Sequence, residues 1–176
     1  MSLLRNETVL IVDCQTTGSS PASGDLLELG WARYCASDPI DKLESHSTHR
    51  LIEPGQNSIP RRVTELTGIT DDDLAEAHDR KQVWNEFQSA LDSVNFLVAH
   101  YAQFEVRFLQ ALADEHKAGI SIKNRTICTH EMARRLLNGL PRKGIRPIAG
   151  YWGHSLPEQK RTRHHVPATA LIWSQL

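Results

Sequence analysis

Near its N-terminus the chain reads Thr8-Val9-Leu10-Ile11-Val12-Asp13-Cys14-Gln15-Thr16-Thr17-Gly18, and this stretch decides the fold. Residues 9–12 are apolar without a polar interruption, which is typical of a strand covered on both faces. The Thr-Thr-Gly that follows predicts a sharp turn. We therefore expect a buried strand over residues 8–13 that ends at Asp13. Gln15 comes two positions later, on the same face of an extended chain, where a second carboxylate would complete a pair of metal ligands.

Length and composition are those of an ordinary globular protein. The chain has 176 residues, of which 40% are hydrophobic and 23% charged, so we expect a single domain over residues 1–176 with a full core. No apolar stretch approaches the ~20 residues that span a membrane, and the N-terminal residues lack the pattern of a signal peptide. The three cysteines have no CxxC spacing, which fits a reducing compartment. These features predict a cytoplasmic protein with no membrane contact.

Charge is unevenly distributed along the chain. The net charge is only −1, so total charge does not indicate a nucleic-acid partner. After Lys117, however, the only acidic residues are Glu131 and Glu158, and Lys and Arg gather in residues 142–146 and 160–163. This basic end could neutralise the phosphates of a nucleic acid, or it could be a solvated basic face with no ligand.

Strand and helix patterns alternate along the rest of the chain. Short apolar runs mark the strands, and apolar residues at helical spacing mark the helices. This alternation predicts an α/β protein with a mixed sheet flanked by helices. After the first strand we expect strands at residues 27–35, 45–53, 96–99 and 125–128, and helices at residues 83–91, 104–117, 131–137 and 167–173, the last with Pro167 in its first turn.

Several motifs resemble, in order, those of the DEDDh family of 3′–5′ exonucleases, which includes ribonuclease T and the epsilon-like proofreading subunits of DNA polymerase III. The opening stretch is similar to the family motif Asp-x-Glu-Thr-Thr-Gly, and residues 100–105, His-Tyr-Ala-Gln-Phe-Glu, are similar to the second motif, usually His-Asn-x-x-Phe-Asp. Residues 25–32 are similar to the family's second strand, residues 66–74 to part of the segment after its third strand, and residues 127–136 to its following strand-to-helix segment. The resemblance implies a ribonuclease H-like fold. It also implies a nuclease site in which four carboxylates hold two metal ions and a histidine deprotonates the attacking water.

The first two motifs depart from the family pattern. Asp13 keeps the first carboxylate, but Gln15 stands where the family has Glu. An amide oxygen can bind a hard cation but brings no charge. Glu105 replaces Asp with a longer carboxylate, and Tyr101 replaces Asn, where it could stack on a base or simply pack. The plainer alternatives are a turn-capping role for Asp13 and an exposed helix position for Glu105.

The third motif, usually His-x-x-x-x-Asp, departs further. An alignment without a gap places Lys160 on the family histidine and His165 on its aspartate, whereas a gapped alignment makes His164 or His165 the general base. No Asp or Glu follows Glu158, so the last helix supplies no carboxylate to any site. The two histidines could bind a transition metal or a phosphate, or they could be exposed residues of a basic loop.

These positions define the candidate site and its metal. The resemblance implies Asp13, Glu105 and His165 as metal ligands. Two carboxylates balance one divalent ion but not two, so we expect Mg²⁺ or Mn²⁺ with one ion at most, and Mn²⁺ better tolerates an imidazole ligand. The candidate catalytic residues are Asp13, Gln15, Glu105, Lys160, His164 and His165.

Two functions of different kinds remain open. The first is a 3′–5′ exonuclease acting on the 3′ ends of single-stranded DNA or RNA, with weakened or altered metal dependence. The second is a catalytically inactive module of the same fold that binds nucleic acid or a partner protein. The sequence leaves open whether the chain forms a homodimer or joins a polymerase or nuclease. The candidate nucleic-acid contacts are Thr16, Thr17, His100, Tyr101, Phe104, Arg142, Lys143, Arg161 and Arg163.

Overall fold

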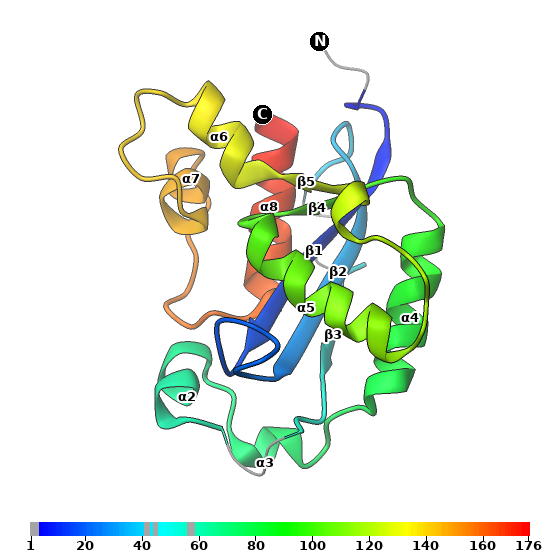
Figure 1. Ribbon diagram of the computed structural model, residues 1–176. Coiled ribbons are helices and arrows are strands. Elements are labelled where there is room, and N and C mark those ends of the chain that lie inside the picture. The colour runs from blue at the N-terminus through cyan, green and yellow to red at the C-terminus, as the bar shows by residue number, and fades with distance from the viewer. Residues whose placement is uncertain (1–3, 41–42, 44–45, 56–58) are drawn as a thin grey trace.

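The computed structural model describes residues 4–40, 43, 46–55 and 59–176. Within these residues a five-stranded sheet runs through the molecule in the order β3-β2-β1-β4-β5 (Figure 1). The antiparallel pairs are β1 with β2 and β2 with β3, and the parallel pairs are β1 with β4 and β4 with β5. This arrangement confirms the mixed sheet expected from the sequence. The strands are β1 Thr8–Thr16, β2 Leu26–Cys35, β3 Thr48–Leu51, β4 Leu97–Ala99 and β5 Thr126–Cys128.

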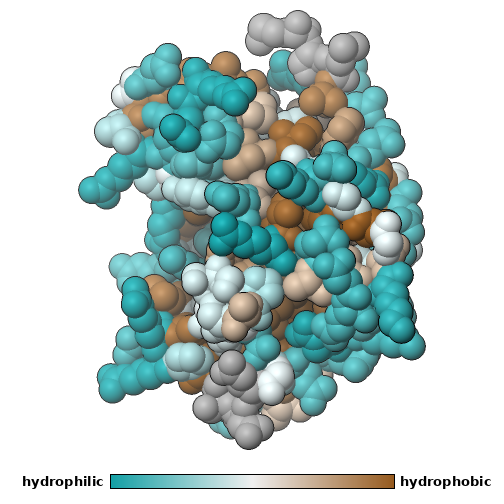
Figure 2. Space-filling view, viewed as in Figure 1, coloured by the Kyte–Doolittle hydropathy of each residue, from teal (hydrophilic) through white to brown (hydrophobic). Residues whose placement is uncertain are grey.

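Helices cover both faces of the sheet, as Figure 1 shows for α5 in front of it and α8 behind it. On the face seen in Figure 2, hydrophilic residues predominate at the surface and hydrophobic residues lie mostly in the recesses between them. No helix in the described part of the chain is long and apolar enough to cross a membrane. The helices are α2 Arg61–Thr67, α3 Asp71–Leu74, α4 Arg80–Asp92, α5 Ala102–Glu115, α6 Thr129–Leu136, α7 Ile145–Tyr151 and α8 Thr162–Gln175, with a short 3-10 turn η1 Lys123–Arg125.

Alternation along β1 divides its side chains between two cores. Leu10 and Val12 belong to the core that β1 forms with α4 and α5, whereas Val9 and Ile11 belong to the core that it forms with α8. Successive strand residues point to opposite faces. Asp13 and Gln15 therefore continue the row that faces α8, and Cys14 between them faces α5.

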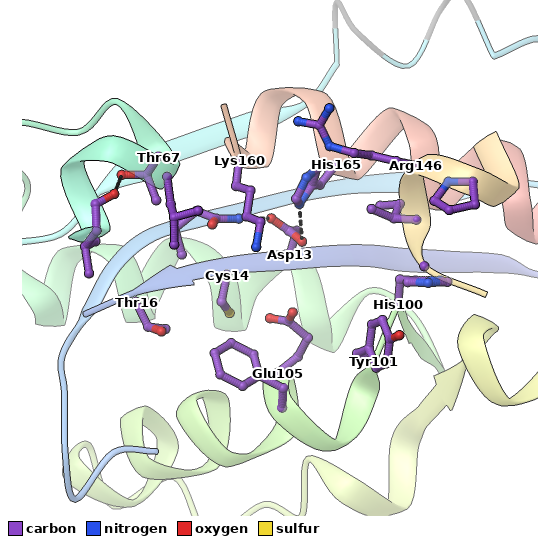
Figure 3. Close-up of a pocket in the computed structure, with 17 residues that line it drawn as sticks. Asp13, Cys14, Thr16, Thr67, His100, Tyr101, Glu105, Arg146, Lys160 and His165 are labelled. Atoms are coloured by element: carbon purple, nitrogen blue, oxygen red, sulfur yellow. Dashed lines mark hydrogen bonds and ion pairs between the residues drawn. The ribbon is translucent and has the colours of Figure 1, made fainter. Parts of the chain in front are cut away.

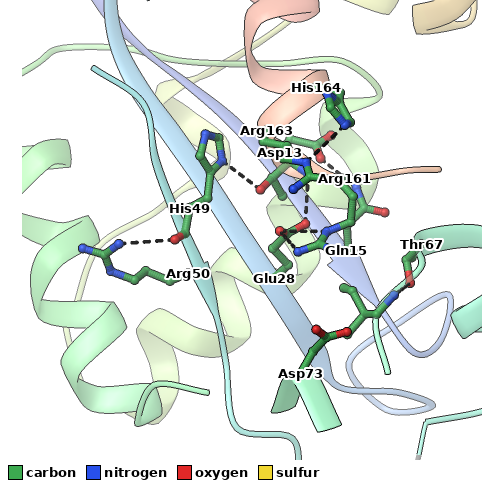
Figure 4. Close-up of polar contacts among 12 residues, drawn as sticks. Asp13, Gln15, Glu28, His49, Arg50, Thr67, Asp73, Arg161, Arg163 and His164 are labelled. Atoms are coloured by element: carbon green, nitrogen blue, oxygen red, sulfur yellow. Dashed lines mark hydrogen bonds and ion pairs between the residues drawn. The ribbon is translucent and has the colours of Figure 1, made fainter. Parts of the chain in front are cut away.

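The first turn of α8 is fixed to β2 by polar contacts and by close packing. The buried Glu28 carboxylate accepts a hydrogen bond from the Thr162 backbone N–H at 2.9 Å, and it binds the Arg161 guanidinium at 2.9 and 3.1 Å (Figure 4). A Cβ atom at Gly30 would lie 2.4 Å from Thr162 Cβ, so only glycine permits this approach. These contacts bring the start of α8 beside the end of β1.

Several expected boundaries were wrong. β1 runs on past Asp13 to Thr16 because its pairing with β2 continues there, with Gln15 opposite Glu28. The last helix begins at Thr162 rather than at Pro167, which lies inside α8. The expected strand at residues 45–53 is shorter, Thr48–Leu51, and its residue 45 lies outside the described residues. The sequence analysis did not foresee α2 and α7.

Candidate active-site pocket

A pocket of about 580 Å³ lies at the carboxyl end of β1, between α2, α5, α7 and α8. Side chains from segments far apart in the sequence meet there. The predicted site residues that line it are Asp13, Gln15, Thr16, His100, Tyr101, Phe104, Glu105, Lys160 and His165. The structure therefore brings most of the predicted site residues together in one place. They include Lys160 and His165, which the alignment without a gap assigns to the third motif.

Both carboxylate oxygens of Asp13 are engaged by side chains of the protein. The Gln15 amide Nε2 donates to Asp13 Oδ2 at 2.7 Å, and the His165 ring Nδ1 donates to Asp13 Oδ1 at 3.2 Å (Figure 3). All three residues are buried. Burial works against a charged imidazole, but the charge and hydrogen bond of Asp13 outweigh it and raise the pKa of His165. At positions 15 and 165 the family resemblance implies two more carboxylates. This chain instead has two side chains there that donate hydrogen bonds to Asp13.

Glu105 lies on the other side of β1, next to Cys14. Figure 3 shows it on the α5 side, opposite Lys160 and His165. Its Oε2 atom is buried and has no hydrogen-bond partner among the described residues. Burial and the negative charge of Asp13 raise the pKa of Glu105 well above its usual range, against the hydrogen bonds from Cys14. Glu105 is thus not the exposed helix residue of the plainer alternative.

Two cations lie on the α8 side of the pocket. Lys160 precedes α8, and its backbone N–H is held by the Leu66 carbonyl at 2.8 Å while its side chain extends into the pocket. Arg146 of α7 donates to the Leu156 carbonyl at 3.2 Å and also to the Pro157 carbonyl. The positive charges of both residues act to lower the pKa of His165, against the effect of Asp13.

His100 uses both ring nitrogens inside the protein. Its Nε2 donates to the Lys143 carbonyl at 2.9 Å, and its Nδ1 lies 3.0 Å from the Thr129 hydroxyl. Burial lowers its pKa to about 4 despite the Lys143 contact, so the ring is neutral near pH 7. A neutral ring that donates through Nε2 must accept at Nδ1. The Thr129 hydroxyl is therefore the donor in its contact with His100 Nδ1. His100 therefore holds the segment before α7 against the end of β4.

Tyr101 stands at the edge of the pocket in a strained conformation. Its φ angle is +61°, in the left-handed region that residues other than glycine rarely adopt. The ring stacks on His130 with centroids 3.9 Å apart and planes inclined by 23°, and 49% of the residue is exposed. Such strain is often found at functional sites.

Several predicted residues lie outside the pocket lining. Thr17 closes the turn between β1 and β2, where its hydroxyl accepts from the Asp25 N–H at 2.7 Å. Arg161 is bound to Glu28, and the His164 ring accepts from Arg163 at 3.2 Å (Figure 4). His164 therefore belongs to a different surface from His165. The other predicted residues that the pocket lining leaves out are Arg142 and Lys143.

Sequence reasoning missed the apolar wall that α2 and α7 provide. Val63, Leu66 and Thr67 of α2 line the pocket, as do Ile145 and Pro147 of α7. The spacing of residues 63, 66 and 67 is that of one helix face, which is the signal that could have revealed α2.

The donor set does not suit a divalent ion in this arrangement. Among the residues that the structure describes, no group of three or more His, Cys, Asp or Glu side chains could hold a metal ion. Asp13, Glu105 and His165 line the same pocket, but each Asp13 oxygen already accepts a hydrogen bond from the protein and Glu105 lies across β1. Their joint role as metal ligands therefore stays a prediction from the sequence.

Comparison with known proteins establishes the family. A family model described as "Exonuclease", of the ribonuclease T type, matches residues 10–165. The chain belongs to the DEDDh 3′–5′ exonuclease family. Proteins of this family typically use divalent metal ions. Curated relatives include the PolC-type DNA polymerase III of Streptococcus pneumoniae, 32% identical over 170 residues, and that of Streptococcus thermophilus, 30% identical over 169 residues. Each match covers 96% of this chain but only 11% of the polymerase.

Solved structures show the same fold. Escherichia coli exonuclease I in complex with a dT13 oligonucleotide has a TM-score of 0.77 at 14% identity, over 96% of this chain and 40% of that one. The nuclease domain of 3′hExo bound to rAMP has a TM-score of 0.71 at 14% identity, over 97% of this chain and 91% of that one. The fold is therefore ribonuclease H-like, as the resemblance implied.

Proposed function

We propose that this pocket binds the 3′-terminal nucleotide of a single-stranded nucleic acid and that phosphodiester hydrolysis there is lost or strongly reduced. One observation carries the proposal. The two oxygens of Asp13 are hydrogen-bonded to Gln15 and His165, at 2.7 and 3.2 Å.

The loss of hydrolysis follows from the charge of the site. Metal ions that hydrolyse phosphodiesters are held by ionised carboxylates whose oxygens are free to ligate them. Here Asp13 brings one negative charge, and His165, with its raised pKa, opposes it from 3.2 Å away. Gln15 adds no charge, and in the alignment without a gap Lys160 stands where the family has its catalytic histidine. Losing a general base alone typically costs about 10²–10⁴ in rate.

The walls of the pocket support nucleotide binding. A volume of about 580 Å³ lies within the range of about 300–1,000 Å³ that is usual for small-molecule sites. Leu66, Phe104 and Ile145 provide apolar walls, and the exposed ring of Tyr101 offers a surface on which a base can stack. The ligands of the two solved structures with this fold, a dT13 oligonucleotide and rAMP, are of the same chemical class as the proposed ligand.

Other parts of the hypothesis remain predictions. A single Mg²⁺ or Mn²⁺ held by Asp13, Glu105 and His165 would require Asp13 to exchange its hydrogen bonds for metal contacts. A homodimer, a polymerase or nuclease partner and a cytoplasmic location are likewise expected from the sequence alone. The PolC relatives make a polymerase the first partner to test.

Binding and hydrolysis can be tested on the same protein. Fluorescence anisotropy with labelled single-stranded DNA and RNA should show binding that weakens steeply with salt, because phosphates are neutralised by Lys and Arg. Release of mononucleotides from the same strands should be negligible in Mg²⁺ and at most slow in Mn²⁺. No binding at low salt would refute the nucleic-acid assignment. Robust Mg²⁺-dependent cleavage that Asp13→Ala abolishes would refute the loss of catalysis.

A further inference from the structure

The pocket holds a cation that has no ion-pair partner among the described residues. The Lys160 side chain has no hydrogen-bond or ion-pair partner among the described residues, although it lines the pocket. The backbone N–H of Lys160 donates to the Leu66 carbonyl, and the next residue, Arg161, is bound through its side chain to Glu28. The ammonium group is therefore presented into the cavity from a fixed point (Figure 3).

Arg146 adds a second permanent positive charge to this wall of the pocket. Its guanidinium is oriented by the Leu156 and Pro157 carbonyls, which are neutral acceptors and leave its charge uncompensated. A guanidinium carries five N–H donors, so donors remain for a ligand.

The carboxylates of the pocket do not cancel these charges. Asp13 is already bound to His165 and to the Gln15 amide, and Glu105 lies on the opposite side of β1. The α8 side of the pocket therefore presents an excess of positive charge beside an apolar wall. This combination suits an anion attached to a nucleobase-bearing group.

We propose that Lys160 and Arg146 form an anion subsite that takes a terminal phosphate, so that the pocket selects nucleic-acid 3′ ends carrying a 3′-phosphate over those carrying a 3′-hydroxyl, without a divalent ion. The inference rests on the proposed function, which places a 3′ end in this pocket. A terminal phosphate monoester carries about two negative charges near pH 7, whereas a diester carries one. Two fixed cations therefore favour the terminal group over an internal linkage.

Anisotropy titrations in EDTA test this selectivity. The probes are one internally labelled single strand with a 3′-hydroxyl, the same strand with a 3′-phosphate, and the same strand with a 5′-phosphate and a 3′-hydroxyl. We expect the 3′-phosphate to lower the Kd by about tenfold or more, as for one charge-assisted hydrogen bond. The 5′-phosphate should change the Kd by less than about twofold, since it adds charge far from the pocket.

Variants connect the preference to the subsite. Lys160→Met should reduce the 3′-phosphate preference to about twofold or less, whereas Lys160→Arg should keep most of it because the charge remains. Lys81→Met is the matched control, since Lys81 is exposed on α4, away from the pocket, and its change should leave the preference intact. Thermal unfolding of each variant checks that the fold is retained.

Each outcome has a distinct meaning. Equal affinity for the 3′-hydroxyl and 3′-phosphate strands would overturn the subsite while the proposed function stands. An equal gain from a 5′-phosphate, or a preference that appears only with added Mg²⁺ or Mn²⁺, would also overturn it. A preference that survives in Lys160→Met would remove Lys160 from the subsite. Failure of every strand to bind would instead refute the proposed function.

Discussion

Replacing Gln15 with Glu should destabilise the protein by an amount that grows with pH. The Gln15 amide lies 2.7 Å from an oxygen of Asp13, so the variant would place two carboxylates in contact in a buried site. With an effective dielectric constant of about 20, repulsion between two full charges at 2.7 Å would reach about 6 kcal/mol.

Protonation limits this cost. Holding a Glu of ordinary pKa in its neutral form costs about 1 kcal/mol at pH 5 and about 4 kcal/mol at pH 7, because each pH unit above its pKa costs about 1.4 kcal/mol. Both values are below the repulsion, so the introduced carboxyl should take up a proton and share it with Asp13. The expected loss of stability therefore rises by about 3 kcal/mol from pH 5 to pH 7 as an upper limit, since protonation of His165 would offset part of it.

Urea unfolding of the wild type and of Gln15→Glu in EDTA at pH 5, 6 and 7 measures this slope. Gln82→Glu is a matched control, because the Gln82 amide also donates to a carboxylate, that of Glu86 at 3.2 Å, but at an exposed position of α4. Its effect should stay within about 0.5 kcal/mol at every pH. A loss at Gln15→Glu that does not change with pH would refute the contact between Gln15 and Asp13.

Three further changes test other parts of the site. Replacing His165 with Gln should flatten the stability profile at neutral and alkaline pH in urea unfolding from pH 5.5 to 9. The folded-state pKa of His165 is raised, so the Asp13–His165 pair contributes fully below its unfolded pKa of about 6.5 and loses this contribution as pH rises through the folded value. The double change Gln15→Glu with His165→Asp should raise Mg²⁺-dependent release of mononucleotides more than the two single changes together, because ligands of one ion are coupled. Replacing Glu28 with Gln should lower the free energy of unfolding by about 2–3 kcal/mol in urea titration, since it leaves the largely buried Arg161 guanidinium without its counter-ion.

Controls make each of these results decisive. Glu65→Gln is the control for Glu28→Gln. It removes an ion pair with Arg61, whose side chain is 92% exposed, and should change stability by no more than about 0.5 kcal/mol. Equal losses at Glu28 and Glu65 would mean that the Glu28 contact does not hold α8. Wild-type protein that matches the double variant in Mg²⁺ would contradict the donor arrangement around Asp13. An unchanged pH profile in His165→Gln would show that folding does not shift the pKa of His165, which would contradict its contact with Asp13.

The row of residues along β1 shows what the sequence can predict. Period-2 alternation places Asp13 and Gln15 on one face before any coordinates are known, and the structure has them there. The alternation of strands and helices likewise predicted the mixed sheet, whereas it was the resemblance to the family that placed Glu105 and His165 in one site, and both line the pocket. Local patterns succeed here because each depends on residues close together in the chain.

The contacts between distant segments could not be predicted in this way. The hydrogen bond from His165 to Asp13 joins residues 152 positions apart, and its formation depends on how Glu28 and Gly30 hold the first turn of α8. The same anchor explains why α8 begins five residues before Pro167. The ring nitrogens of His100, a predicted nucleic-acid contact, bind Lys143 and Thr129, and no local pattern reveals those partners.

The hydrogen bonds around Asp13 also determine how the protein responds to its ionic surroundings. A cluster of bare carboxylates repels itself until cations arrive, so the shape and stability of such a site depend on the metal supply of the cell. In this chain the trio of Asp13, Gln15 and His165 is held together by attraction within the protein. The pocket is therefore complete as soon as the chain has folded, and its shape should be the same in metal-starved and metal-replete cells.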